Sequence, residues 1–174
     1  MTNLSELSVV TYKRVLTASI GVLEKGAAHF KEQGLDLNDL VEMQLTADMA
    51  GFPFQVQSVT HHSLGAAKGI TAGEFSPPPS LPETDYQGHI DRLKATLEEL
   101  NSIDTNAIDA AAGSAVYFRM GEMEIPFTAE NFVMSFSLPN LYFHAATLYD
   151  MLRIQGVPIG KTDFLGPMAM GLPQ

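Results

Sequence analysis

The chain has 174 residues, of which 45% are hydrophobic and 17% charged, so it can fill the core of one domain, residues 1–174, and is not disordered over most of its length. Acidic residues outnumber basic residues by 20 to 10, and no run of Lys or Arg offsets the net charge of −10, so we expect no nucleic acid partner. The lack of cysteine excludes disulfides, thiolate nucleophiles, zinc fingers and iron–sulfur clusters.

Apolar residues that recur every three or four positions predict a first helix from Ser8 to Gln33, with Gly34 as its C-terminal stop. A connector follows over residues 35–49, in which a short helix opens at Asn38. The first helix presents one apolar side, which we expect to face a core.

A second long helix is predicted from Gly51-Phe52-Pro53, where Pro occupies the first turn, to Ile70. Several of its inward residues are small, so a neighbouring helix can approach closely. The segment 73–82 contains three consecutive prolines and must be an extended loop. The pattern Thr84-Asp85-Tyr86-Gln87 is typical of a capping box and opens a third helix that reaches Ile103.

The apolar period changes to two between Val116 and Thr128, which predicts a β-hairpin that turns at Gly121-Glu122 and packs on the helices. The last helical region runs from Ala129 to Gln155, and Pro139 should kink or split it at Leu138.

We expect the four main helices to form a mainly all-α, up-down bundle in which consecutive helices are antiparallel. Gly156 and Pro158 stop the last helix, and the tail 159–174 is predicted to be irregular. The segment 156–166 should nonetheless fold back over the end of the bundle, because Phe164 and Leu165 offer apolar anchors.

The N-terminal residues 1–10 lack a basic region and a long apolar stretch, so we predict no signal peptide and expect a cytoplasmic protein. The longest uncharged run, residues 131–149, is long enough to span a membrane. It carries Pro139, His144 and several amide and hydroxyl side chains, however, so it is interpreted as a buried helix.

Three familiar catalytic patterns are not supported. The segment Gly156–Thr162 resembles a phosphate-binding loop, but it is one residue short and follows a helix instead of a strand. No Glu has a His three residues later, which a di-iron bundle would require, and no Gly-x-Ser-x-Gly elbow indicates a serine hydrolase.

Helical geometry separates the histidines. With about 100° per residue, His62 lies at the border of the apolar face of the second helix, Gln55 lies two turns earlier on the same border, and His61 points nearly the opposite way. His144 lies beside the apolar face of the last helix. His62 and His144 can therefore both face into the bundle, whereas His29 and His89 have no partner that the sequence indicates.

The segments Leu138–His144 (LPNLYFH) and Leu152–Gly166 (LRIQGVPIGKTDFLG), together with 54–67, resemble an uncharacterised bacterial domain-of-unknown-function family in the DinB-like superfamily. The resemblance covers nearly the whole chain. It implies a four-helix bundle that is commonly dimeric and has a cavity between its helices, so we expect a homodimer.

Many members of this superfamily bind a divalent metal through one His from the second helix and two His, four residues apart, from the last. Some are thiol-dependent transferases or hydrolases. In this chain His62 matches the first position and His144 one of the other two. Asn140 and Leu148 stand four residues before and after His144, so the third imidazole is missing.

Three functional hypotheses remain open. The first is a metal-dependent transferase or hydrolase with zinc or nickel at His62 and His144, completed by Gln55, Tyr149 or a water. The second is a non-catalytic small-molecule-binding or interaction protein, whose pocket is lined by Tyr142, Phe143, His144, Met151 and the small residues of the second helix. The third is a purely structural dimerisation module without a cavity.

The missing third ligand favours small-molecule binding with at most a weakly bound zinc or nickel ion. The two imidazoles can equally be satisfied by hydrogen bonds alone. The candidate ligand-binding residues are Gln55, His62, Tyr142, His144 and Tyr149, and whether the protein is an enzyme stays open.

Overall fold

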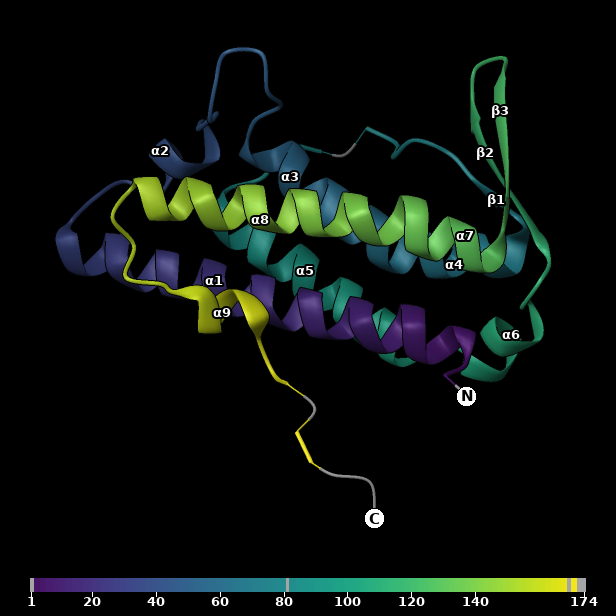
Figure 1. The fold of residues 1–174 in the computed structure, drawn as a ribbon. Coiled ribbons are helices and arrows are strands. Elements are labelled where there is room, and N and C mark those ends of the chain that lie inside the picture. Colours follow the sequence, from purple (N-terminus) through teal and green to yellow (C-terminus); the bar gives the residue numbers. More distant parts are fainter. Residues whose placement is uncertain (1, 81, 169, 172–174) are drawn as a thin grey trace.

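The structure, a computed structural model, describes residues 2–80, 82–168 and 170–171. Four long helical segments pack side by side in this part of the chain, with a small sheet at one end (Figure 1). The first is η1 (Glu6–Val10) and α1 (Thr11–Gln33); the second is α3 (Phe52–Thr60), η2 (His61–Gly65) and α4 (Ala66–Ala72); the third is α5 (Tyr86–Asn101); the fourth is α7 (Ala129–Phe132), η3 (Val133–Ser137) and α8 (Leu138–Ile154). The shorter elements are α2 (Asn38–Val41), β1 (Glu74–Phe75), α6 (Thr105–Ala110), β2 (Ala115–Met120), β3 (Met123–Thr128) and α9 (Lys161–Leu165).

The predicted helices and hairpin are confirmed, and their apolar faces form one core. Leu16, Leu23, Val56, Leu93 and Leu141 are all fully buried. Each such side chain contributes roughly 1.5–3 kcal/mol to the free energy of unfolding. None of the described helices is long and apolar enough to cross a membrane.

The ends of two helices show how local sequence sets their bounds. Gly34 ends α1 in the left-handed conformation, with φ 69°, and the amide of Leu35 bonds the carbonyl of Phe30. α5 begins one residue later than the predicted capping box implies. Asp85 is the cap, because its extended backbone lets its carboxylate accept a hydrogen bond from the amide of Gly88, at 2.8 Å.

The order of the helices differs from the expected up-down arrangement at one connection. Phe52 at the start of α3 stacks on Tyr86 at the start of α5, and Lys68 near the end of α4 pairs with Glu99 near the end of α5. The second and third segments are therefore parallel, and the described residues 73–80 and 82–85 of the proline-containing connection lie along the bundle between them (Figure 1). A long extended crossover permits this order, which short loops would exclude.

The hairpin joins a third strand that the sequence did not predict. β2 and β3 pair antiparallel from Ala115↔Thr128 to Met120↔Met123, and Gly121 turns the chain with φ 60°. β1 pairs parallel with β2. Two residues are too few to show a period, so β1 could not be predicted from alternation.

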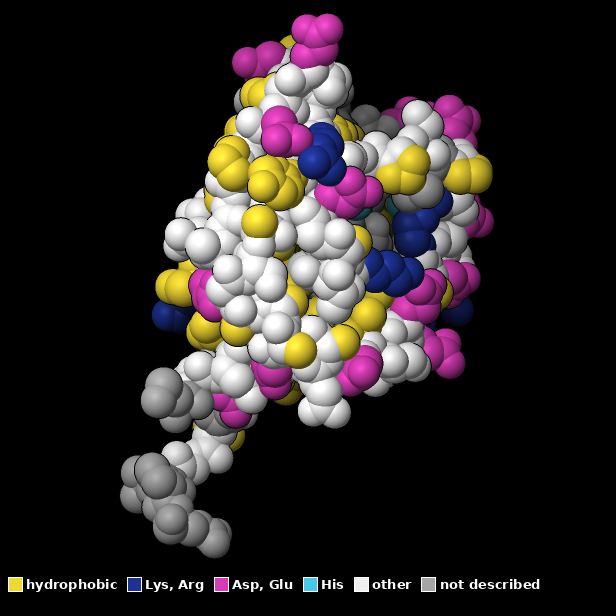
Figure 2. All heavy atoms as spheres, turned by 90° about the vertical axis from the view of Figure 1, so that its right-hand side faces the viewer, with side chains coloured by type: hydrophobic (Ala, Val, Ile, Leu, Met, Phe, Trp, Pro, Cys, Tyr) yellow, Lys and Arg dark blue, Asp and Glu magenta, His cyan; other side chains and the backbone are white. Residues whose placement is uncertain are grey.

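On the end face that Figure 2 shows, acidic side chains are interspersed among uncharged ones, and the basic side chains form separate spots.

The helix continues through Pro139, because η3 runs directly into α8. The π-helical turn η3 directly precedes it, and the change to α-helix falls at Leu138, where the sequence predicted a break. A proline interrupts the backbone hydrogen-bond ladder. Around the proline, the side chains of Ser135 and Asn140 donate to carbonyls one helical turn earlier, those of Asn131 and Phe136, the latter at 2.7 Å. The wider turn thus accommodates the proline without ending the helix.

The C-terminal segment 156–166 docks on the bundle, as expected, but it lies along α1 and not over the end. Val157 and Ile159 are buried, and Asp163 bonds Lys25 at 2.5 Å. The tail is also not wholly irregular, because α9 forms there. Asp163 accepts a hydrogen bond from the amide of Gly160 at 2.8 Å and so caps this short helix.

We expect Phe164→Ala to lower the free energy of unfolding by about 1–3 kcal/mol, because the half-buried ring packs between α1 and α8. Leu165→Ala is the matched control, since its side chain is exposed. Urea unfolding of both variants measures the difference. Equal stabilities of the two variants would show that the segment is not held by this ring.

Candidate functional site

His62 and His144 lie on facing helical segments and point into the bundle, as predicted. Their rings are nearly parallel, with an interplanar angle of 13° and centroids 5.9 Å apart. His62 belongs to η2 and His144 to α8, and their residues are 8% and 9% exposed. We call these two residues and Gln55 the histidine cluster.

The side chain of Gln55 fixes the proton of His144. Its amide nitrogen donates to the carbonyl of Ala50 at 2.7 Å, so its oxygen faces Nδ1 of His144, also at 2.7 Å. An amide oxygen can only accept, so Nδ1 must carry the proton. In a neutral ring, Nε2 of His144 then has a free lone pair.

His62 has a different environment. Its buried Nδ1 has no hydrogen-bond partner among the described residues. Its backbone carbonyl accepts a hydrogen bond from the Ser137 hydroxyl at 3.0 Å, and this hydroxyl also bonds that of Tyr12 at 2.6 Å. The backbone of His62 is therefore held firmly, while its ring retains an unused polar atom.

Both rings are neutral at physiological pH. Burial, together with the proximity of His61 and His144, lowers the pKa of His62 to about 3. Burial also lowers the pKa of His144 to about 4. A neutral imidazole offers one N–H donor and one lone pair, so the cluster can bind a hydrogen-bond donor or a metal ion.

Aromatic side chains surround the cluster on two sides. Phe54 and Phe143 contact the ring of His144 edge-to-face and are 43% and 55% exposed. Phe75 and Phe136 pack near the ring of His62. The exposed pair, which we call the aromatic rim, marks the side from which a ligand can approach His144.

The structure does not bring the two predicted tyrosines to the cluster. The hydroxyl of Tyr142 accepts a hydrogen bond from Arg14 at 2.8 Å, and the ring of Tyr149 packs on Phe164. At about 100° per residue, both tyrosines lie well away from His144 around the axis of α8. Helical phase could have excluded them from the start.

The residues of the cluster do not supply the three protein ligands that catalytic zinc requires. No group of three or more His, Asp or Glu side chains in the described residues could hold a metal ion. Leu148 is buried and apolar, and the Asn140 amide donates to the carbonyl of Phe136. The cluster thus offers two imidazoles and one neutral amide.

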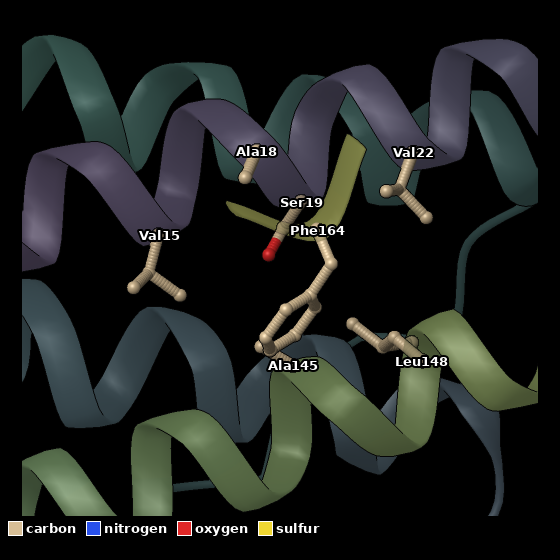
Figure 3. Close-up of a pocket in the computed structure, with 7 residues that line it drawn as sticks. All are labelled: Val15, Ala18, Ser19, Val22, Ala145, Leu148 and Phe164. Atoms are coloured by element: carbon tan, nitrogen blue, oxygen red, sulfur yellow. The ribbon is translucent and has the colours of Figure 1, made fainter. Parts of the chain in front are cut away.

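A small cavity lies between α1, α8 and the docked segment (Figure 3). Its volume is about 10 Å³, which holds one water at most. Ala145 and Leu148 line it, together with Phe164 and residues of α1. The expected lining was different: Tyr142, Phe143, His144, Met151 and the small residues of the second helix. This cavity is too small for an organic ligand.

One histidine that sequence reasoning left without a role is also buried. His89 in α5 is 2% exposed, and neither of its ring nitrogens has a partner among the described residues. Burial lowers its pKa to about 4, Arg92 adds to this effect and Asp85 opposes it. His89 lies three residues after Tyr86 and four before Leu93, on the apolar stripe of the helix. This spacing could have predicted from the sequence that His89 is buried.

The free energy of unfolding should fall as the pH is lowered from about 6.5 to 4. His62, His89 and His144 have lower pKa values in the folded state, so the unfolded chain binds more protons in this range. Each contributes a slope of up to about 1.4 kcal/mol per pH unit. Urea unfolding across this range should show a shallower slope for His144→Phe than for the unsubstituted protein; identical slopes would contradict a neutral, buried His144.

Comparisons with known proteins agree with this fold. The model of the family described as domain of unknown function DUF1993 matches residues 4–165. No curated protein matches the chain in sequence. The crystal structure of a DinB family member protein from Shewanella denitrificans is 25% identical, with a TM-score of 0.82 over 98% of this chain and 96% of that one.

The family match spans the four long helical segments, the hairpin and α9. The structural match extends the likeness to almost the full length of a DinB family member. The chain therefore belongs to the DUF1993 family and has a DinB-like helical fold.

Proposed function

We propose that the protein binds a small organic molecule at the histidine cluster, through a hydroxyl or N–H group of that molecule. The observation that carries the proposal is the bond between Gln55 and Nδ1 of His144, which leaves the lone pair on Nε2 of a neutral ring. A ligand that donates a hydrogen bond would use this lone pair. The unpartnered Nδ1 of His62 supports the same site.

The surroundings favour a ligand that is largely apolar. Phe54 and Phe143 form an aromatic rim whose exposed faces can pack against a ring or an alkyl chain. Pockets for small molecules typically combine such apolar walls with a few fixed polar atoms. Since burial keeps both rings neutral, a donor without charge fits the cluster better than an anion or a cation.

Benzyl alcohol is a suitable probe, and toluene, which lacks the hydroxyl, is its matched control. In NMR titrations we expect benzyl alcohol to shift the ring resonances of His144 and Phe143. Toluene should bind roughly 2- to 10-fold more weakly, because a neutral hydrogen bond contributes about 0.5–1.5 kcal/mol.

The variant His144→Phe keeps the aromatic volume and removes the lone pair. It should bind the two probes with equal affinity. If the unsubstituted protein already fails to distinguish them, or if the shifts fall elsewhere on the molecule, the proposed role of the cluster is wrong.

The alternative function is a metal-dependent transferase or hydrolase at the same residues. Its support is the Gln55–His144 bond, because histidines that bind metal usually donate their other N–H in this way. Two imidazoles and an amide should hold zinc or nickel only weakly, so either metal should raise the melting temperature little.

Restoring a third imidazole should create a tight site. Leu148 and Asn140 lie one turn, about 6 Å, after and before His144, so we expect Leu148→His or Asn140→His to bind one zinc ion per chain in calorimetry. Leu152→His is the matched control: it also buries an imidazole, but about 12 Å along the helix. Submicromolar zinc binding by the unsubstituted protein, lost in His62→Ala and His144→Ala, would establish the metal-dependent alternative instead.

A further inference from the structure

A second, larger pocket opens at the surface where the starts of α3 and α5 meet. Its volume is about 500 Å³, enough for a small organic ligand. Val41 of α2 and the next residue, Glu42, contribute one side, and Pro53 and Phe54 of α3 contribute another. The rest comes from the crossover segment, which includes Glu83, and from His89 and Arg92 of α5. We call this the crossover pocket.

Phe54 separates the crossover pocket from the histidine cluster. It lines the pocket, and it also contacts the ring of His144. His62 and His144 are not among the residues that line the pocket. The two sites are therefore neighbours with different polar groups.

The inner wall of the pocket holds a polar side chain that nothing in the described protein satisfies. His89 is 98% buried, packs edge-to-face on Phe52, and has no hydrogen-bond partner for either ring nitrogen. Two buried, unpaired ring nitrogens lower the free energy of unfolding. An apolar residue at this position would fill the same space without this loss. A ligand in the pocket would recover that loss.

Arg92 lies one helical turn from His89 and lines the same pocket. One of its nitrogens donates to the carbonyl of Pro82 at 3.2 Å. Among the described residues it forms no ion pair with a carboxylate, whereas Arg119 on the sheet pairs with two. Its remaining N–H donors are thus available, next to the single N–H of a neutral His89.

We propose that the crossover pocket binds a small monocarboxylate with an apolar body, whose carboxylate is held by Arg92 and His89. A guanidinium matches the geometry of a carboxylate and can bond both of its oxygens. Val41, Pro53 and Phe54 provide the apolar wall for the rest of the molecule. Glu42 and Glu83 also line the pocket, and their repulsion grows with the charge of an anion, so a single negative charge fits better than a doubly charged phosphate.

Phenylacetate is the probe that tests this assignment, with phenethylamine and phenyl phosphate as ligands of similar size and different charge. In NMR titrations of the full chain, phenylacetate should shift the resonances of Val41, Phe54 and His89, and it should bind more tightly than the other two. Preferred binding of phenethylamine or of phenyl phosphate would overturn the proposed class of ligand.

Arg92→Gln should weaken phenylacetate binding at least about tenfold, because it removes a charge-assisted pair. Lys94→Gln is the matched control: it removes the same charge from the same helix, but Lys94 pairs with Glu24 outside the pocket. Equal losses in the two variants would show that only the general charge of the protein matters, and would contradict the site.

His89→Phe separates binding from stability. It should raise the melting temperature, because it removes two unpartnered nitrogens from the interior, and at the same time weaken phenylacetate binding. If the phenyl ring of His89→Phe is too large for this position, His89→Leu tests the same two effects with a smaller apolar side chain. A rise in melting temperature with unchanged affinity would show that His89 takes no part in binding.

Discussion

Three of the four long helical segments meet at one buried hydroxyl, that of Ser137. It bonds the hydroxyl of Tyr12 from α1 and donates to the backbone carbonyl of His62 in η2. Both hydroxyl-bearing residues are completely buried, where an unpaired polar group would cost roughly 1–3 kcal/mol. The relative position of α1, η2 and η3 is thereby restricted, since sliding any one segment would leave a polar atom unsatisfied.

This restriction explains why the histidine cluster has its geometry. The bond from Ser137 fixes the backbone of His62, and the continuous helix from η3 into α8 carries His144 two turns further along. Gln55 then orients the ring of His144 from the opposite segment. The two rings are nearly parallel, and the described residues include no direct hydrogen bond between them.

The sequence predicted the elements in which apolar residues recur with a regular period. The four long helices, the hairpin and the inward positions of His62 and His144 follow from apolar period and helical phase. β1, α6 and α9 are too short to show a period, and the parallel order of the second and third segments depends on the path of the crossover. Helical phase indicates that Gln55 and His144 both face the bundle, but it does not show whether the two side chains meet. The protonated nitrogen of His144 could be identified only from the hydrogen bond between them. The homodimer and the cytoplasmic location stay predictions.

The choice of an amide at position 55 determines which chemistry the cluster favours. A carboxylate there would accept the same proton from Nδ1 of His144, but its charge would stabilise the imidazolium and raise the pKa of the ring. The amide of Gln55 orients the ring equally well and adds no charge, so burial keeps the pKa of His144 near 4. Without a negative neighbour, neither imidazole gains the added basicity that a carboxylate confers on metal-binding histidines. These features support the proposed binding of a neutral hydrogen-bond donor over the alternative of a divalent cation.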